Sequence, residues 1–174
     1  MYLLDANAII TPFHSGTLGS LQVALNHASP HDTRLWLEDW YRKGFSNQKL
    51  VTCREVLDEV KSPSNITQLI RALRPRLKIL EPQSVTFAYE KDIHNFVVKN
   101  FELHQADEFL KSSDPLLIAL AKTYGATLVT LERRTIPERN PKSRRIKGKV
   151  SIAFIAWTFE VRCIGLLQAF REVT

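Results

Sequence analysis

Apolar residues occur along the chain in two patterns, as short continuous runs and as longer stretches with an apolar position every three or four residues. Short runs bounded by polar or turn residues predict buried β-strands, here at residues 2–4, 50–52, 127–131 and 161–163. Helical periodicity predicts a helix after the polar turn at residues 5–7, a last amphipathic helix ending at Arg171, and helices over residues 33–43, 54–61, 66–73, 85–100, 115–124 and 152–159. This alternation favours an α/β domain with a mostly parallel sheet.

Turn and helix-start residues set several of the expected boundaries. Gly44 and Gly125 are expected to stop the helices that precede them. Asp114 precedes Pro115, a pair typical of a helix N-cap with proline at the first helical position. In the helix expected over residues 85–100, the positions predicted to face the core are Phe87, Ile93, Phe96 and Val97.

Composition narrows the class of protein. The chain has 174 residues, of which 44% are hydrophobic and 24% charged, as in one globular domain with its own core. No run approaches the roughly 20 apolar residues of a membrane span, and the first residues lack the basic leader of a signal peptide. The two cysteines, Cys53 and Cys163, form no CxxC motif. We therefore expect free buried thiols and a cytoplasmic protein without membrane contacts.

Most of the positive charge lies in one segment, residues 133–149. The whole chain has a net charge of +6, whereas this segment holds eight Lys or Arg residues and one acid, for a local charge of +7. Such a patch suits a phosphate backbone, although charge alone fits a solvated loop equally well. We expect an unstructured arm that binds nucleic acid through Arg133, Arg134, Arg144, Arg145, Lys147 and Lys149.

Acidic residues follow two of the expected strands. Asp5 comes directly after the first strand, Glu132 follows the third, and Asp114 begins a helix. Taken singly, each acid has a structural explanation, such as a helix cap for Asp5 and Asp114. Ligands bind beyond the carboxyl ends of the strands in open parallel sheets, so two acids at such ends together favour a functional site.

Four motifs in order resemble the PIN-domain family of nucleases. LLDANAII resembles the first motif, VTCREVLDEV the second, and SDPLLIALAKTYGATLVTLE the third and fourth. More narrowly, WLEDWYRKG followed by LVTCREVLDEV resembles a branch related to toxin–antitoxin ribonucleases. The resemblance covers most of residues 1–174 and implies one three-layer α/β/α domain. It also implies a metal-dependent endoribonuclease that acts on RNA, with an antitoxin protein as partner and a homodimeric assembly.

The resemblance assigns roles to individual residues. The catalytic and metal-binding acids that it implies are Asp5, Glu59, Asp114 and Glu132. Supporting roles fall to Asn7, Thr130 and Glu55, the last a weaker match to the second motif than Glu59. Glu132 stands where most PIN proteins have an aspartate, so its carboxylate reaches one methylene further.

Clustered carboxylates suit a particular chemistry. Mg²⁺ and Mn²⁺ prefer oxygen ligands, and Mg²⁺ keeps several waters, so a few carboxylates suffice to bind it. The same carboxylates would repel one another unless a cation neutralised them. A bound ion, or a pair of ions, would position water for attack on a phosphodiester bond. We therefore expect Mg²⁺ or Mn²⁺ as the cofactor.

Other functions fit less well or only in part. A haloacid-dehalogenase-like phosphatase needs a second aspartate where this chain has Asn7, and the five histidines form no HExxH zinc motif. The tryptophans Trp36, Trp40 and Trp157 occupy apolar helical positions, which favours packing over base stacking. The main alternative is a PIN-like domain that binds RNA or a protein without cutting RNA, since Glu132 replaces the usual aspartate.

Overall fold

A four-stranded parallel sheet forms the centre of the computed structural model, which describes residues 1–133, 135 and 137–173. The strands are β1 (Tyr2–Leu4), β2 (Leu50–Val51), β3 (Thr127–Thr130) and β4 (Cys163–Gly165), in the order β2-β1-β3-β4. In register, Leu4 pairs with Val129 and Thr130 pairs with Gly165. The predictions of an α/β chain and a parallel sheet are confirmed.

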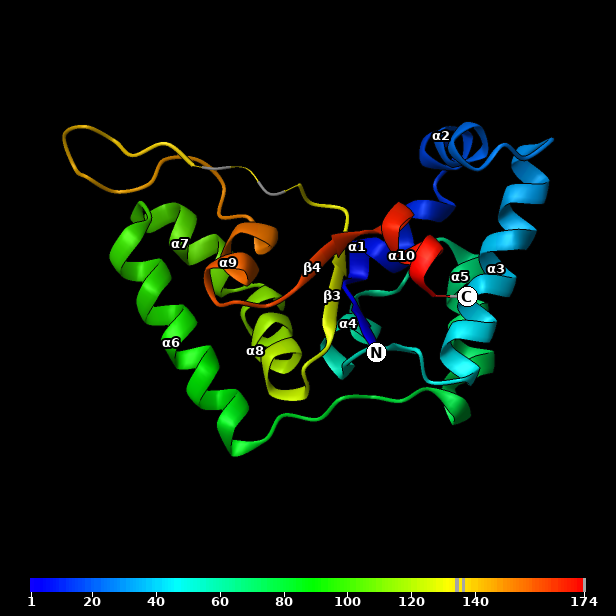
Figure 1. Ribbon diagram of the computed structural model, residues 1–174, viewed down its shortest axis with the longest axis horizontal. Coiled ribbons are helices and arrows are strands. Elements are labelled where there is room, and N and C mark those ends of the chain that lie inside the picture. Colours follow the sequence, from blue (N-terminus) through cyan, green and yellow to red (C-terminus); the bar gives the residue numbers. More distant parts are fainter. Residues whose placement is uncertain (134, 136, 174) are drawn as a thin grey trace.

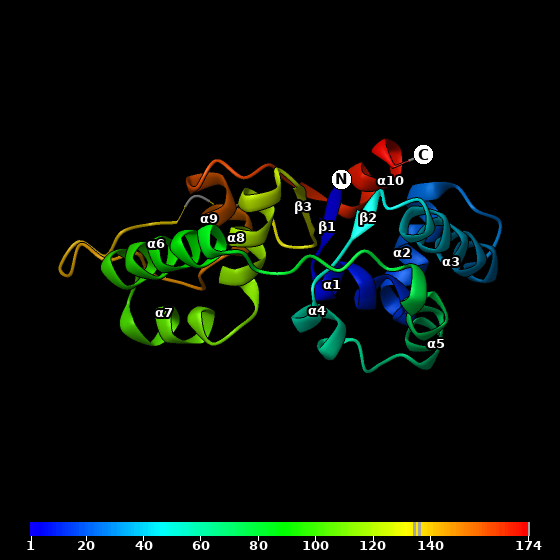
Figure 2. The same cartoon turned by 90° about the horizontal axis from the view of Figure 1, so that it is seen from below.

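Helices lie on both sides of these strands (Figures 1 and 2). In both views α6, α7, α8 and α9 lie on one side, and α2, α3 and α5 lie on the other, an arrangement compatible with α/β/α layering. Two 3₁₀ turns, Thr11–Phe13 and Arg74–Arg76, join neighbouring elements. The helices are α1 (Ala6–Ile10), α2 (Ser15–Leu25), α3 (Pro30–Ser46), α4 (Arg54–Glu59), α5 (Ser64–Leu73), α6 (Ser84–Asn100), α7 (Leu103–Leu110), α8 (Asp114–Tyr124), α9 (Ile152–Thr158) and α10 (Leu166–Glu172).

The core forms around β1, β3 and α8. The side chains of Leu3, Leu4, Leu128 and Val129 are fully buried, as expected for strands covered on both faces. The helix α8 is apolar around most of its circumference and packs most extensively against α6. As predicted, it ends at Gly125, whose φ of 60° lies in the left-handed region that glycine adopts without strain. This core fixes the position of the helix that carries Asp114.

Three predicted boundaries or faces are wrong, each for a local reason. The helix α3 continues past Gly44, where a Cβ atom would lie 2.5 Å from Leu50 Cδ1, so this glycine allows a close helix–strand approach. The fourth strand starts at Cys163 instead of residue 161, because Glu160 has a φ of 59° and the Val161 amide still caps α9. Phe87 is 57% exposed, since Ile93 and Val97 define the buried face of α6.

Two helices were not predicted. Helix α2 contains two glycines and two serines, which lower its helix propensity, and α7 is only eight residues long. Both cysteines are free, as expected; Cys53 is buried, whereas Cys163 is only half-buried. No helix in the described part of the chain is long and apolar enough to cross a membrane.

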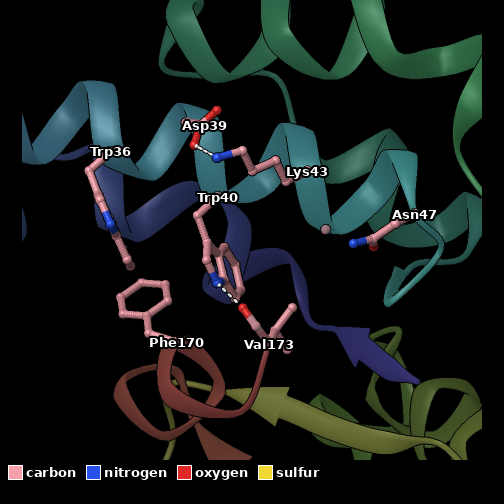
Figure 3. A pocket seen from close by; sticks show the side chains of 8 residues that line it. Trp36, Asp39, Trp40, Lys43, Asn47, Phe170 and Val173 are labelled. Carbon is pink, nitrogen blue, oxygen red and sulfur yellow. Dashed lines mark hydrogen bonds and ion pairs between the residues drawn. The ribbon is translucent and has the colours of Figure 1, made fainter.

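The C-terminal helix α10 is held against α3 by aromatic side chains (Figure 3). The ring of Phe170 lies edge-on to Trp36 and Trp40, with ring centroids 5.0 and 4.8 Å away. Trp40 Nε1 also donates a hydrogen bond to the Val173 carbonyl over 3.0 Å. A pocket of about 240 Å³ remains beside these rings. For Trp36 and Trp40 the packing interpretation is therefore confirmed.

Candidate functional site

Asp5 lies at the carboxyl end of β1 and is almost fully buried. It is the N-cap of α1: its Oδ1 accepts a hydrogen bond of 3.4 Å from the Asn7 amide, and its Oδ2 accepts one of 2.9 Å from the Thr130 hydroxyl. Burial raises the pKa of Asp5, and the charges of Glu59 and Glu132 raise it further, against the two hydrogen bonds. Asp5 therefore caps α1, as expected, and also lies among other acidic side chains.

Thr130 connects two of the predicted acidic positions. It is the last residue of β3, is fully buried, and donates its hydroxyl proton to Asp5. The same oxygen accepts a hydrogen bond of 3.2 Å from the Glu132 amide. Asn7, the other predicted supporting residue, acts on Asp5 through its backbone amide, while its side chain is exposed. Thr130 is therefore the residue that positions the end of β1 against the end of β3.

Asp114 lies in the first turn of α8, close enough to the other acids to respond to their charge. The N-cap is Ser113, so the prediction that Asp114 itself caps the helix is wrong; it is the first helical residue. The pKa of Asp114 is raised to about 7, mainly by burial and further by the charges of Asp5 and Glu132. A hydrogen bond with Ser112 and the charge of Lys149 oppose it. The carboxylates of Asp5, Asp114 and Glu132 are thus electrostatically coupled.

Of the two acids in α4, Glu59 is directed toward this region. Its Oε1 accepts a hydrogen bond of 2.7 Å from the Ser113 hydroxyl, next to Asp114, and its charge raises the pKa of Asp5. Glu55 lies one turn earlier and interacts instead with the buried thiol of Cys53. The contacts therefore agree with the choice of Glu59 over Glu55 as the acid of the second motif.

Glu132 joins the two ends of the basic segment. One carboxylate oxygen, Oε1, forms an ion pair with Lys149, and Oε2 accepts a hydrogen bond of 3.0 Å from the Ile152 amide at the start of α9. The hydrogen bond with Glu132 raises the pKa of Lys149, and the charges of Asp114 and Asp5 raise it further. A lysine ammonium group is therefore the cation present among these carboxylates.

The donor chemistry of these acids suits a hard divalent cation, because it consists of carboxylates whose mutual repulsion a cation would relieve. Their arrangement is more open than a closed metal site. Within residues 1–133, 135 and 137–173, no three His, Cys, Asp or Glu side chains are grouped so that they could hold an ion. Both oxygens of Glu132 are engaged by the protein itself. The two oxygens of Asp5 are also hydrogen-bonded, but Glu132 differs in that Lys149 already neutralises its charge, whereas Asp5, Glu59 and Asp114 form no ion pair with a described cation.

Comparison with known proteins gives a family but no activity. Residues 2–174 match the family described as "Domain of unknown function (DUF4411)". The chain belongs to the DUF4411 family. No curated protein and no solved structure matches it. The comparisons therefore assign no role to the carboxylates, and their role is inferred from the structure of this DUF4411 protein alone.

The basic segment of this DUF4411 protein divides into two parts. Arg133 and Lys149 lie at its ends, beside Glu132, whereas residues 137–147 extend past α7 (Figure 1). That outer part is not an unstructured arm, so this prediction is wrong. Ile146 is buried and exchanges backbone hydrogen bonds with Asn100 and Glu102, and the Arg145 guanidinium donates to the Phe101 carbonyl over 3.0 Å.

The five described residues among the six predicted nucleic-acid-binding residues consequently do not form one patch. Arg133 and Lys149 lie at the carboxylate site, and Arg144 and Lys147 are exposed on the outer part of the segment. Arg145 is half-buried against α6 and α7. Arg134 lies outside the described residues. The segment is therefore a tethered loop whose two ends, rather than its middle, border the acids.

A groove that sequence reasoning missed continues from the carboxylate site. It has a volume of about 1080 Å³ and runs from Thr130 and Glu132 along β4 to α9 and α10. Trp157, for which packing in the core or an interface was expected, lines this groove and is 57% exposed. Periodicity alone could not predict this exposure, because Trp157 lies four residues after the buried Ala153 and so shares its side of α9.

Proposed function

We propose that this DUF4411 protein is a PIN-like, metal-dependent endoribonuclease. The observation that carries the proposal is the electrostatic coupling of Asp5 and Asp114 at the carboxyl edge of a parallel sheet. Two buried or half-buried acids with raised pKa values cost stability, and such groups concentrate at functional sites. The order of the four motifs supports the same assignment, as does a three-layer α/β/α arrangement.

Asp5, Glu59 and Asp114 would hold Mg²⁺ or Mn²⁺ in this proposal. When bound, the ion would supply a Lewis acid for the phosphodiester and a water of lowered pKa. Thr130 holds the Asp5 carboxylate in one orientation through its hydroxyl. Ser113 does the same for Glu59, so that α8 fixes a ligand on α4 as well as its own Asp114.

Glu132 has a different role in the proposed site. Because Lys149 already neutralises its charge, we assign Glu132 to positioning the lysine and the start of α9 instead of binding metal directly. Lys149 places a positive charge where a scissile phosphate would approach the acids. Its ammonium group stabilises negative charge on that phosphate and donates a hydrogen bond to it.

The substrate and partners follow from the same resemblance. RNA is the proposed substrate, and the charge of residues 133–149 supports a polyanionic ligand. A role as the toxin of a toxin–antitoxin pair, an antitoxin protein as partner, a homodimer and a cytoplasmic location stay predictions.

A second function is favoured by one specific observation. No three described acidic, cysteine or histidine side chains are grouped to hold an ion, and a lysine supplies the neutralising charge. This arrangement suits a PIN-like domain that binds RNA or a protein partner without cutting RNA. The two functions differ in whether the protein cuts RNA and needs its acids to do so.

Cleavage of a mixed RNA pool separates these functions. The wild-type chain should cut RNA with Mg²⁺ or Mn²⁺ and stop cutting in excess EDTA, and Asp5→Asn should remove cleavage. Asp107→Asn is the matched control, because Asp107 is an exposed acid on α7 paired with Lys111. Wild-type protein that binds RNA but does not cut it with either metal would reject the nuclease and leave the binding domain.

A further inference from the structure

The groove beside the carboxylate site has apolar walls and a cationic rim. Three of its lining side chains, Leu131, Trp157 and Leu167, are large hydrophobic groups that remain 37%, 57% and 44% exposed. Large apolar side chains that stay exposed within one groove indicate a binding site more often than exposed residues scattered singly do. Its volume of about 1080 Å³ is at the upper end of the roughly 300–1,000 Å³ typical of ligand sites.

Positive charge surrounds these apolar walls. Arg133, Arg162 and Arg171 line the groove, and among the described lining residues Glu132 is the one acid. Glu132 is neutralised by Lys149, and Arg162 is paired with Glu172. Arg133 and Arg171 are exposed and form no ion pair with a described carboxylate, so their charges remain available to an anionic ligand.

The groove borders the proposed reaction centre at one end. Thr130 and Glu132 line it, and the buried Thr130 hydroxyl bonds to Asp5, which is not among the lining residues. A chain bound in the groove would therefore pass beside Glu132, next to the strand end that carries Thr130. Strand β4 forms the floor and lies at the edge of the sheet, with β3 as its partner.

We infer that this groove binds single-stranded nucleic acid, with a base stacked on Trp157 and the adjoining phosphates on Arg133 and Arg171. A base offers a flat apolar face and its backbone offers anions, which match an indole beside two arginines. Stacking is independent of base identity, so the groove would hold a strand in place without choosing a sequence. The inference rests on the proposed function only in assigning that strand as RNA.

An extended peptide that pairs with the edge of β4 is the competing occupant. A peptide would gain from the backbone of β4 and the apolar walls, but it needs neither an exposed indole nor the guanidinium groups of Arg133 and Arg171, which form no ion pair with a described carboxylate. The positive charge of the rim favours the nucleic acid.

The test measures binding without catalysis. Fluorescence anisotropy measures the affinity of the full-length chain, in EDTA, for a labelled RNA octamer and for an abasic octamer of the same length. Trp157→Ala should weaken octamer binding by roughly 5- to 100-fold, the range expected for removal of one base stack, and should leave abasic binding unchanged. Trp157→Phe should keep most of the affinity. Phe87→Ala is the matched control, since Phe87 is equally exposed on the far helix α6 and should have no effect.

The arginines are tested by the salt dependence of the same binding. Arg133→Gln with Arg171→Gln should reduce the slope of log affinity against log salt by about 1.4, or roughly 0.7 for each phosphate that is no longer neutralised. Arg74→Gln with Arg76→Gln, a pair of exposed arginines remote from the groove, should leave the slope unchanged.

Three results would overturn the inference: Trp157→Ala equal to Phe87→Ala, equal losses of affinity for the octamer and the abasic strand, or displacement of the octamer by polyglutamate at the same charge. Because the assay contains EDTA, no divalent ion contributes to the measured affinity. Groove binding without any metal-dependent cleavage would reject the nuclease proposal and keep this inference, and cleavage without Trp157-dependent binding would do the reverse.

Discussion

The hydroxyl of Thr130 donates to Asp5 Oδ2 over 2.9 Å and so ties the carboxyl end of β3 to the carboxyl end of β1. The two residues are 125 positions apart in sequence, and both are buried. A buried carboxylate needs such a donor, because burial without a hydrogen bond penalises its charged form. The contact explains why a threonine, and not a purely apolar β-branched residue, ends this strand.

Thr130→Val should therefore destabilise the protein while preserving its packing volume. The valine leaves Asp5 Oδ2 and the Glu132 amide without their partner, at a cost of about 1–3 kcal/mol in the free energy of unfolding. Thr130→Ser restores the hydroxyl and should recover most of that stability. Urea unfolding of the three proteins at neutral pH measures the difference. Equal stability of the valine and serine variants would show that the hydroxyl contributes nothing.

Glu132 and Asp5 should differ in their effect on cleavage. Asp5→Asn removes a proposed metal ligand and should reduce RNA cleavage below detection. Glu132→Gln loses only the charge that holds Lys149, so its rate should fall by roughly 10- to 100-fold, as for residues that orient a metal site from outside. Initial rates at saturating Mn²⁺ compare them. An inactive Glu132→Gln protein that still folds would make Glu132 a ligand after all.

Asp114 should make the metal-free protein less stable as pH rises. Its pKa is about 7 in the folded protein and near 3.8 when unfolded, so between these values the folded state holds a proton that the unfolded state has lost. The free energy of unfolding therefore falls from about pH 4 to pH 7 and levels off above that range. Asp114→Asn should remove this part of the slope. Urea unfolding at pH 5 and pH 8 in EDTA tests it; identical slopes for both proteins would contradict the raised pKa.

Lys149 should moderate the same ionisation. Its charge lowers the pKa of Asp114, against the effects of burial and the neighbouring acids. Lys149→Gln removes that charge, so the pKa of Asp114 should rise above its wild-type value. Carboxyl chemical shifts followed by NMR over pH 5 to 9 report it. Arg144→Gln, on the outer part of the basic loop, is the control and should leave the titration unchanged.

Much of the fold follows from local patterns in the sequence. Apolar runs predicted β1, β2 and β3, and the Asp114–Gly125 signals located α8, because burial and capping act over a few residues. The start of β4 was predicted two residues too early. Glu160 adopts a left-handed conformation before the strand, and a glutamate, unlike a glycine, does not signal this conformation in the sequence. Gly44 was wrongly predicted to end a helix. A glycine is needed there because the side chain of Leu50, which belongs to β2, packs against it, and this contact between two elements cannot be seen in the local sequence.

The candidate site divides in the same way. Asp5 and Glu132 could be placed from their positions after predicted strands, whereas Thr130 and Glu59 came from the motif resemblance; in the structure Thr130 bonds to Asp5 and the charge of Glu59 acts on it. The pairing of Glu132 with Lys149 across the basic segment could not be predicted, because it depends on how a loop of 16 intervening residues returns to the sheet. The exposure of Trp157 depends equally on what the neighbouring elements leave uncovered.

Binding of Mn²⁺ tests the central claim, that Asp5 and Asp114 belong to one divalent cation site. Isothermal titration of Mn²⁺ into the wild-type chain at pH 8, where Asp114 is ionised, should show saturable binding that Asp5→Asn and Asp114→Asn each abolish. Asp107→Asn should bind as the wild type does. Absence of saturable binding to the wild type, or equal binding by all four proteins, would contradict the claim.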